Sequence, residues 1–473
     1  LYFSSMYFVF GTTERRKVKR KLNRKKVDEM KKVVVIFLTS FLMILILIMN
    51  APSALAESNE LQQLIDNTDK GDTLHLEGKV YEGNVVIKQP ITIIGEEGTV
   101  IEGDRTGNVI EIEADNVTLD TLEVLGSGMS RDSREEYSGI RVMGNNATIQ
   151  NVKVTESFHG ILLNRIDNTT MKNMTIIGEK TENLSQQGNG IHILRSSNNV
   201  IEDSFISGFR DGVYIEYSDN NSVNNNTMRD TRYGMHYMYS DYNSFKNNKF
   251  VHNIGGAAIM HSDYITLENN EFSFNQGSRS FGLLIQTSRE VHALNNEFHL
   301  NQRGLLIEHS TGNHIESNEF FKNTIGIEVW ASAISNVFSK NIFSKNTNQV
   351  LTVGKNADNS WSDMFGNGNY WDEPMLDLDE DGIGDIPFEY TSSLGDLIEK
   401  SDELAYLFLN SPAVQVYEKT NDVLGNQDVM ALDEYPLILE REKDYSLLIA
   451  TVATAVIISG IYFLIKRRKK AHK

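Results

Sequence analysis

"RDGVYIEYSDNNSVNNNTM" (residues 210–228) is followed almost at once by "RYGMHYMYSDYNSFKNNKF" (residues 232–250), and both stretches follow one template. Aligned on Gly212 and Gly234, the two copies repeat their apolar, serine and asparagine positions 22 residues apart. A pattern that recurs at a fixed period of this length indicates a chain built by stacking one structural unit.

The template extends well beyond these two copies. Glycines that open an apolar pair recur at Gly139, Gly160, Gly190, Gly212, Gly234, Gly256, Gly282, Gly304 and Gly326. Asparagines run in step with them at Asn226, Asn248, Asn270, Asn296, Asn318 and Asn341, and methionine or phenylalanine stands two residues after each. Short alternating segments with this period predict an all-β fold, a right-handed parallel β-helix, rather than helical repeats. We expect aligned asparagines to hydrogen-bond along the stack and aligned phenylalanines to pack inside it.

The remaining segments flank this solenoid. "NELQQLIDNT" (59–68) has the pattern of a short amphipathic helix, which would cap the open end of the stack. The predicted organisation is an upstream extension or expression remnant (1–29), a signal peptide (30–56), an N-terminal cap (57–71), the β-helix (72–365), a Gly/Asp-rich closing segment (366–390), a juxtamembrane helical segment (391–444), a transmembrane helix (445–465) and a basic tail (466–473).

The location follows from two apolar runs. Lys31 and Lys32 precede "VVVIFLTSFLMILILIM", and "APSALA" supplies a small-x-small cleavage site, the layout of a secretory signal peptide; an uncleaved anchor is the alternative. The run 445–465 carries no charge and is followed by "KRRKKAHK", so the positive-inside rule predicts a cytoplasmic C-terminus. We therefore expect a single-pass protein of the cell membrane whose body lies on the extracytoplasmic side.

Composition excludes two classes of protein. Residues 33–465 hold 28 Lys/Arg against 61 Asp/Glu, and so acidic a body would repel nucleic acid. The chain has no cysteine, so a disulfide scaffold is excluded and stability must come from a large regular core.

Outward positions of the repeat supply a candidate site. Side chains alternate along a strand, so the second and fourth residues after each glycine face outward. This places Met238 above Met260 with His236 on the same face and His261 at the edge, and thioether plus imidazole suits a soft ion such as Cu(I). The alternative is a docking patch without metal. The residues predicted for partner docking are His192, Tyr214, Met235 and Tyr239.

"DLDEDGIGD" (377–385) resembles the first nine positions of a calcium loop, in which aspartates alternate before a glycine turn. The ligands predicted for a structural Ca²⁺ ion are Asp377, Asp379, Asp381 and Asp385. Phe388 stands where the bidentate glutamate is expected, and a solvated acidic turn is the alternative.

Three stretches together resemble the NosD family of β-helical accessory proteins in nitrous oxide reductase maturation. They are the tandem repeat 210–243, "GNGNYWDEPMLDLDEDGIGDIPFEY" (366–390) and "LFLNSPAVQVYEKTNDVLGNQDVMALDEYPL" (407–437), within a likeness that covers residues 60–440. The resemblance implies an extracytoplasmic subunit on an ABC transporter with a permease and an ATPase. It also implies copper delivery to nitrous oxide reductase, with a copper chaperone as partner. Two departures are the run 445–465, where many relatives are soluble, and "WDEPM" in place of a polar stretch.

A β-helix carbohydrate-active enzyme, such as a lyase or epimerase, is the competing reading, because such enzymes carry acidic residues or histidine along an outer sheet. The candidates for that chemistry are Glu216, His236, Glu308 and Glu328. No basic cluster stands beside them to neutralise an acidic sugar, so we expect a protein that is not an enzyme. A cell-surface scaffold without a metal role is the third possibility.

Overall fold

The computed structural model divides the chain into two units, Leu1–Ser58 and Asn59–Lys473. The residues that the structure describes are 30, 32, 36–41, 43, 59–129, 136–179, 186–354, 358–400, 409 and 411–438. In the first unit the described residues are helical and exposed. The predicted parallel β-helix forms the second unit.

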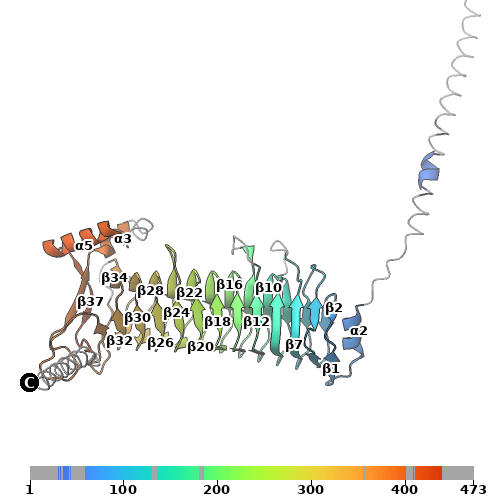
Figure 1. The fold of residues 1–473 in the computed structure, drawn as a ribbon, viewed down its shortest axis with the longest axis horizontal. Coiled ribbons are helices and arrows are strands. Elements are labelled where there is room, and N and C mark those ends of the chain that lie inside the picture. The colour runs from blue at the N-terminus through green and yellow to red at the C-terminus, as the bar shows by residue number, and fades with distance from the viewer. Residues whose placement is uncertain are drawn as a thin grey trace, which may run out of the picture. The chain divides into compact units, whose positions relative to one another are not determined.

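Three strands form a typical coil of this solenoid: one of six residues and two of three (Figure 1). The strands pair in parallel into two sheets, one of twelve strands, which contains all the six-residue strands of the solenoid, and one of 23 strands. The stack therefore has twelve coils. Residues 22 positions apart in the sequence therefore lie side by side in adjacent coils, as Val213 and Met235 do.

The twelve-stranded sheet consists of β3 (Val85–Ile87), β6 (Ile110–Ile112), β8 (Ser138–Val142), β10 (His159–Asn164), β13 (Asn189–Leu194), β16 (Asp211–Glu216), β19 (Tyr233–Met238), β22 (Gly255–Met260), β25 (Phe281–Gln286), β28 (Arg303–Glu308), β31 (Ile325–Trp330) and β34 (Asn348–Val353). The 23-stranded sheet consists of β1 (Thr73–Leu76), β2 (Val80–Glu82), β4 (Thr92–Gly95), β5 (Val100–Glu102), β7 (Thr118–Leu125), β9 (Thr148–Thr155), β11 (Thr170–Lys172), β12 (Thr175–Ile177), β14 (Val200–Glu202), β15 (Phe205–Ser207), β17 (Ser222–Asn224), β18 (Thr227–Arg229), β20 (Ser244–Lys246), β21 (Lys249–Val251), β23 (Thr266–Glu268), β24 (Glu271–Ser273), β26 (His292–Leu294), β27 (Glu297–His299), β29 (His314–Glu316), β30 (Glu319–Phe321), β32 (Val337–Ser339), β33 (Ile342–Ser344) and β35 (Tyr370–Trp371).

The recurring glycine is a packing requirement. A Cβ atom built at Gly234 would lie 2.6 Å from the carbonyl oxygen of Gly256 and 2.7 Å from the ring of Phe250. Any side chain would therefore collide with the next coil and with the core, which explains why glycine recurs in the strands of the twelve-stranded sheet from β8 to β31.

Residues with a left-handed backbone conformation, that is with positive φ, turn the chain at the corners of a coil. In the coil that begins with β16, φ is positive at Tyr217, Asn220, Asn225 and Asp230, between 48° and 58°. Asparagine and aspartate tolerate this region better than other non-glycine residues, which accounts for their abundance at the turns.

The predicted asparagine ladder is present and buried. The Asn270 Nδ2 atom donates to Asn296 Oδ1 at 2.9 Å and to the Phe245 carbonyl at 3.0 Å. Its own Oδ1 atom accepts from Asn248 Nδ2 at 3.0 Å. Each buried amide in the ladder thus forms hydrogen bonds with the asparagines of both adjacent coils, and these bonds fix the register of the stack.

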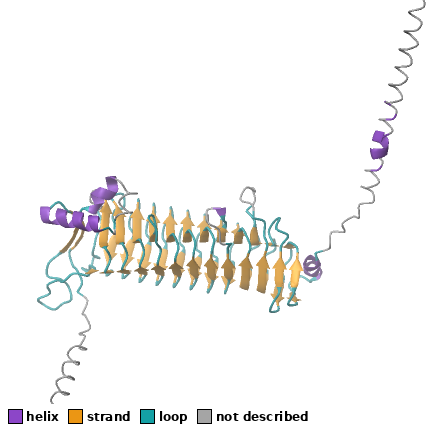
Figure 2. Ribbon diagram, turned by 45° about the horizontal axis from the view of Figure 1, so that its top comes forward, coloured by secondary structure: helices purple, strands orange, loops and turns teal. Residues whose placement is uncertain are grey.

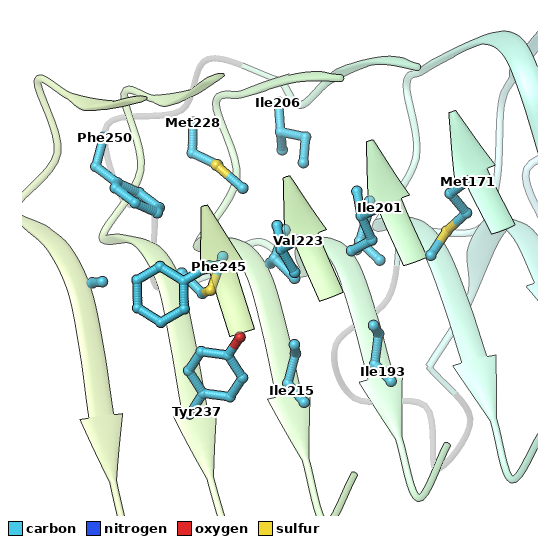
Figure 3. Packing of buried hydrophobic residues seen from close by; sticks show 14 of the residues in the cluster. Met171, Ile193, Ile201, Ile206, Ile215, Val223, Met228, Tyr237, Phe245 and Phe250 are labelled. Carbon is cyan, nitrogen blue, oxygen red and sulfur yellow. The ribbon is translucent and has the colours of Figure 1, made fainter. Parts of the chain in front are cut away.

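The predicted phenylalanine column is also confirmed. Phe250, Phe272, Phe298 and Phe320 stack with ring centroids 4.8–4.9 Å apart, the spacing between strands. Figure 3 shows an adjoining column, in which Tyr237, Ile215 and Ile193 lie side by side inside the core.

Helices and a hairpin close the two ends of the solenoid (Figure 2). At the N-terminal end, α2 (Glu60–Asn67) begins at Asn59, whose side chain accepts the Gln62 N–H at 3.0 Å. The Gln62 side chain then satisfies the backbone of Val86, with bonds of 2.7 and 3.0 Å. This helix therefore covers the open edge of β3.

The C-terminal end is closed by Asp433. Its Oδ2 atom accepts from the Asn369 backbone N–H at 2.7 Å and from Trp371 Nε1 at 2.9 Å. Asn369 is the last member of the asparagine ladder, and Trp371 stacks on Phe343 at 4.6 Å. The segment "GNYW" thus ends both columns.

The segment 391–444, predicted as helical, is only partly so. It contains α3 (Leu394–Lys400) and α5 (Pro412–Leu424), but β37 (Asp428–Asp433) pairs antiparallel with β36 (Phe388–Ser392). The segment is not helical throughout because the β36–β37 hairpin brings Asp433 to the end of the stack, where it accepts the Asn369 N–H.

The two membrane-related predictions are not tested. The predicted transmembrane run 445–465 lies outside the described residues, as do most of the predicted signal peptide and the segment 1–29. Within the described part of the chain, no helix combines the length and apolar character needed to cross a bilayer.

Two tyrosines in the core, Tyr237 buried and Tyr390 partly buried, give a matched test of the packing. The Tyr237 hydroxyl is buried without a hydrogen-bond partner among the described residues, whereas the Tyr390 hydroxyl accepts the Gln349 N–H at 3.1 Å. We expect Tyr237→Phe to keep or raise the free energy of unfolding by up to about 1 kcal/mol, because a buried unpaired hydroxyl is costly. Tyr390→Phe should lower it by about 1 kcal/mol. Denaturant unfolding measures both, and the opposite order would contradict the packing described.

Candidate metal-binding site

Aromatic rings form a row on the outer face of the twelve-stranded sheet. His192, Tyr214 and His236 are register partners on β13, β16 and β19. Their rings stack at 4.9 and 4.8 Å. The row is therefore continuous over three coils, as the period of 22 residues predicts.

His236 is held by a buried carboxylate. Its Nδ1 atom lies 3.1 Å from Oδ2 of Asp211, whose side chain is 0% exposed. Arg232 donates to both oxygens of the same carboxylate, at 2.8 and 2.6 Å. Burial alone would raise the pKa of Asp211, but the hydrogen bonds from His236 and Arg232 outweigh it and lower that pKa to about 2.

The ionised carboxylate fixes the tautomer of the imidazole. An anionic Asp211 can only accept, so His236 must carry its proton on Nδ1. In the neutral ring, Nε2 then keeps its lone pair, and this atom is buried without a hydrogen-bond partner in the described part of the chain. A carboxylate that orients a histidine in this way is the usual support of a metal-ligating imidazole.

Two thioethers share the face with His236. Met238 and Met260 are direct register partners on β19 and β22, and both are half-buried. Met260 packs against an apolar cluster of Ala258, Phe281, Leu284 and Leu306. The predicted registry of the two methionines is therefore confirmed, and the set offers two soft sulfur atoms and one nitrogen.

The edge position predicted for His261 is confirmed. His261 follows β22 in a left-handed corner, where it is exposed and stacks on Tyr239 at 4.9 Å. Tyr239 is 44% exposed and Tyr214 is half-buried. Both remain candidates for docking.

Two docking predictions are wrong. Met235 is 0% exposed, because the first residue after each glycine points into the core. His192 is only 4% exposed, because Glu136 from the insertion 126–139 lies against its ring. Neither side chain is available to a partner.

A buried polar cluster was missed by the sequence analysis. Glu136 Oε2 lies 3.2 Å from His159 Nε2 and 3.4 Å from His192 Nδ1, and Glu216 lies 3.7 Å from His192 Nε2. Burial lowers the pKa of His159. Burial also acts to lower that of His192, but Glu136 and Glu216 outweigh it, so the pKa of His192 is raised.

The donor set of this cluster does not suit a metal at His159. The Asn189 backbone N–H donates to His159 Nδ1 at 2.8 Å, so the proton of the neutral ring is on Nε2, the atom that faces Glu136. The contacts of Glu136 with the two buried histidines therefore anchor the insertion. His159 stands directly before Gly160, where strict alternation assigns a residue to the core, so the repeat pattern did not reveal it.

The predicted calcium loop is partly assembled. Asp377, Asp379 and Asp381 each bring a carboxylate oxygen within 4.8 Å of the other two. The negative charge of Asp381 raises the pKa of Asp379. Asp385 instead accepts the Leu378 N–H at 2.8 Å, within the loop. Calcium binding stays a prediction.

The acidic residues considered for sugar chemistry are engaged elsewhere. Glu328 is 0% exposed, accepts from Trp330 Nε1 at 3.0 Å and lies 3.4 Å from Arg303 Nε. Glu308 accepts from Gln286 at 2.7 Å. Glu216 faces His192, as described above.

A family match covers the coils that carry this site. The model of the NosD family, described as periplasmic copper-binding protein, matches residues 175–376. These coils are similar to the NosD family, and the match spans less than half of the chain. A curated relative from Stutzerimonas stutzeri, named probable ABC transporter binding protein NosD, is 28% identical over 130 residues. That alignment covers 25% of this chain and 29% of the relative.

Solved structures with a similar arrangement are more distant. The catalytic domain of a GH87 α-1,3-glucanase aligns over 67% of this chain and 68% of its own, with 15% identity and a TM-score of 0.49. The adhesin PfbA of Streptococcus pneumoniae aligns over 60% and 85%, with 13% identity and a TM-score of 0.47. The A-module of mannuronan C-5 epimerase AlgE4 from Azotobacter vinelandii aligns over 63% and 94%, with 14% identity and a TM-score of 0.43.

The Asp211 pair predicts an acid-dependent stability. Because its pKa is lowered in the folded state, Asp211 stabilises the fold above the ordinary aspartate pKa of about 4, and this contribution of about 2 kcal/mol is lost as pH falls towards 2. We expect Asp211→Asn to lower the free energy of unfolding at pH 7 by about 3 kcal/mol, with the difference from the unmodified protein shrinking below pH 4.

Asp230 provides the matched control, since it forms only an exposed ion pair with Arg229 at 2.9 Å. Asp230→Asn should change the free energy of unfolding by less than about 0.5 kcal/mol, and its left-handed backbone accepts asparagine. Equal effects of the two substitutions in chemical denaturation between pH 2 and 7 would contradict the assignment.

Proposed function

We propose that this chain is a member of the NosD family, an extracytoplasmic accessory subunit of an ABC transporter that receives Cu(I) from a copper chaperone for nitrous oxide reductase maturation. The observation that carries the proposal is the His236 Nε2 atom. This atom is buried and has no hydrogen-bond partner among the residues that the structure describes, Asp211 fixes the tautomer of the ring, and His236 shares a sheet face with Met238 and Met260.

The donor set matches the cargo. Thioether sulfur and imidazole nitrogen favour Cu(I) over hard cations, and no thiolate is required. The absence of cysteine from the whole sequence leaves methionine as the source of soft sulfur. Half-buried thioethers are shielded from bulk water yet open to a partner, which suits an ion that is received and passed on.

An exposed aromatic edge borders this face and supplies a docking surface. Tyr217, Tyr239 and His261 stack in one corner column at 5.1 and 4.9 Å. Tyrosine presents a large contact area at low entropic cost, and it is enriched where proteins meet. Met238 and Met260 are the last residues of β19 and β22, directly before Tyr239 and His261, so a chaperone bound to this edge would lie beside the two thioethers.

The C-terminal helix α5 supports coupling to a permease. Val416, Val423 and Leu424 on α5 are exposed apolar residues that line one shallow groove together with Lys419 and Thr420. Only residues 439–444 separate the described chain from the predicted span 445–465, so this face would lie close to the bilayer and to a transporter in it.

A polysaccharide-cleaving or -epimerising enzyme is less consistent with the geometry. Its chemistry needs accessible acid and base groups. Glu328 is buried in an ion pair with Arg303, and His236 is hydrogen-bonded to a buried carboxylate. We therefore propose a binding and transfer role without catalysis of its own. A scaffold without a metal role would not require the Asp211–His236 pair.

Copper binding gives the direct test. The Met238→Leu/Met260→Leu double variant keeps the apolar volume and removes both sulfurs. We expect its Cu(I) affinity, measured by competition with a chromophoric Cu(I) chelator, to fall at least about tenfold. Met364→Leu is the control, because Met364 is 90% exposed, and its affinity should be unchanged. Equal affinity in the double variant and the unmodified protein would remove the thioethers from the site.

The role in maturation is tested in cells. The same double variant should lower the copper content of nitrous oxide reductase, and the chain should co-purify with a permease and an ATPase after extraction in mild detergent. A fully loaded reductase, or a chain that purifies alone and degrades polysaccharide, would contradict the proposed function.

A further inference from the structure

A second histidine pair lies on the other sheet of the solenoid. His292 and His314 occupy the first positions of β26 and β29 and are direct register partners. Both side chains are exposed, and their rings stack at 4.9 Å. The neighbouring coils carry Thr266 and Val337 at the same register, so the imidazole pair is confined to two adjacent coils.

A carboxylate completes the group. Glu290 precedes β26 in a left-handed corner. One oxygen of its side chain and one ring nitrogen from each of the two histidines all lie within 4.8 Å of one another. The next coil has Gly312 nearby, where a Cβ atom would meet Glu290 Oε1 at 3.1 Å. Glycine therefore leaves room for the carboxylate beside the two rings.

The imidazoles are free to act as ligands. They contact each other by stacking, and among the described residues neither forms a hydrogen bond or an ion pair. This differs from His159, whose Nδ1 atom is occupied by the Asn189 N–H.

The chemistry selects a class of ion. Two imidazole nitrogens and one carboxylate oxygen form the set preferred by Zn²⁺ and Cu²⁺, with bonds of about 2.0–2.2 Å. Adjacent coils are about 4.8 Å apart, and small rotations of exposed side chains bring two nitrogens onto one ion at that spacing. No thioether is part of the set, so it differs in selectivity from the Cu(I) face.

We propose that Glu290, His292 and His314 form a surface site for a divalent late-transition-metal ion of the Zn²⁺ or Cu²⁺ type. The ion bridges β26 and β29, and so ties two coils of the 23-stranded sheet together. Because the unfolded chain does not hold the three ligands together, binding stabilises the folded solenoid in proportion to the logarithm of the metal concentration.

The test uses Zn²⁺ with the purified full chain. Isothermal calorimetry should detect a Zn²⁺ site whose affinity falls at least about tenfold in His292→Gln and in His314→Gln, with a smaller loss in Glu290→Gln. Zn²⁺ should also raise the thermal unfolding midpoint of the unmodified protein and not that of the His292→Gln/His314→Gln double variant. His75→Gln is the matched control, since His75 is an exposed histidine on β1 of the same sheet.

Two further results separate this site from the copper face. The His292→Gln/His314→Gln variant should bind Cu(I) like the unmodified protein, and the Met238→Leu/Met260→Leu variant should bind Zn²⁺ like it. Unchanged Zn²⁺ affinity in the histidine variants, a loss as large in His75→Gln, or an unmodified protein that binds no Zn²⁺ would overturn the proposal.

Discussion

Parallel registry between coils is the constraint on which the rest of the structure depends. Backbone hydrogen bonds alone would allow a strand to slip, but a buried asparagine such as Asn270 must meet amides in the coils on both sides. A slip would leave several buried amides unpaired, each at a cost of about 1–3 kcal/mol. Registry in turn decides which outward side chains become neighbours, so the stack positions the functional groups without dedicating a loop to them.

This division of labour explains the near-identical copies in the sequence. Inward and ladder positions are fixed by packing, as Gly234 shows, while outward positions are free to differ between coils. At one place the free positions supply His236, Met238 and Met260; at another they supply His292 and His314. The two proposed sites therefore require only substitutions at outward positions of one regular scaffold.

Much of the fold and part of the site could be predicted from the sequence. The repeat period and the alternation along strands gave the coils, the asparagine and phenylalanine columns and the Met238–Met260 neighbours. Met235 was misassigned against that same alternation. Glu136 could not be placed, because it belongs to an insertion outside the repeat. Asp211, which orients His236, stands before the glycine, at an outward position that the pattern analysis did not include. Strand β37 was missed because its only strong signal, Asp433, acts through contacts with Asn369 and Trp371 far away in the chain.

The proposed copper site depends on the lone pair of His236 Nε2, whose availability follows from the tautomer that Asp211 imposes. Burying the Asp211 carboxylate destabilises the fold by desolvation, and the ion pair with Arg232 offsets this effect. The same carboxylate fixes the tautomer of His236. X-ray absorption spectroscopy at the copper edge of the Cu(I)-loaded protein is the most direct measurement. The account predicts two sulfur scatterers and one imidazole in the first shell, with the sulfur signal lost in the Met238→Leu/Met260→Leu variant. A first shell of nitrogen and oxygen alone would contradict it.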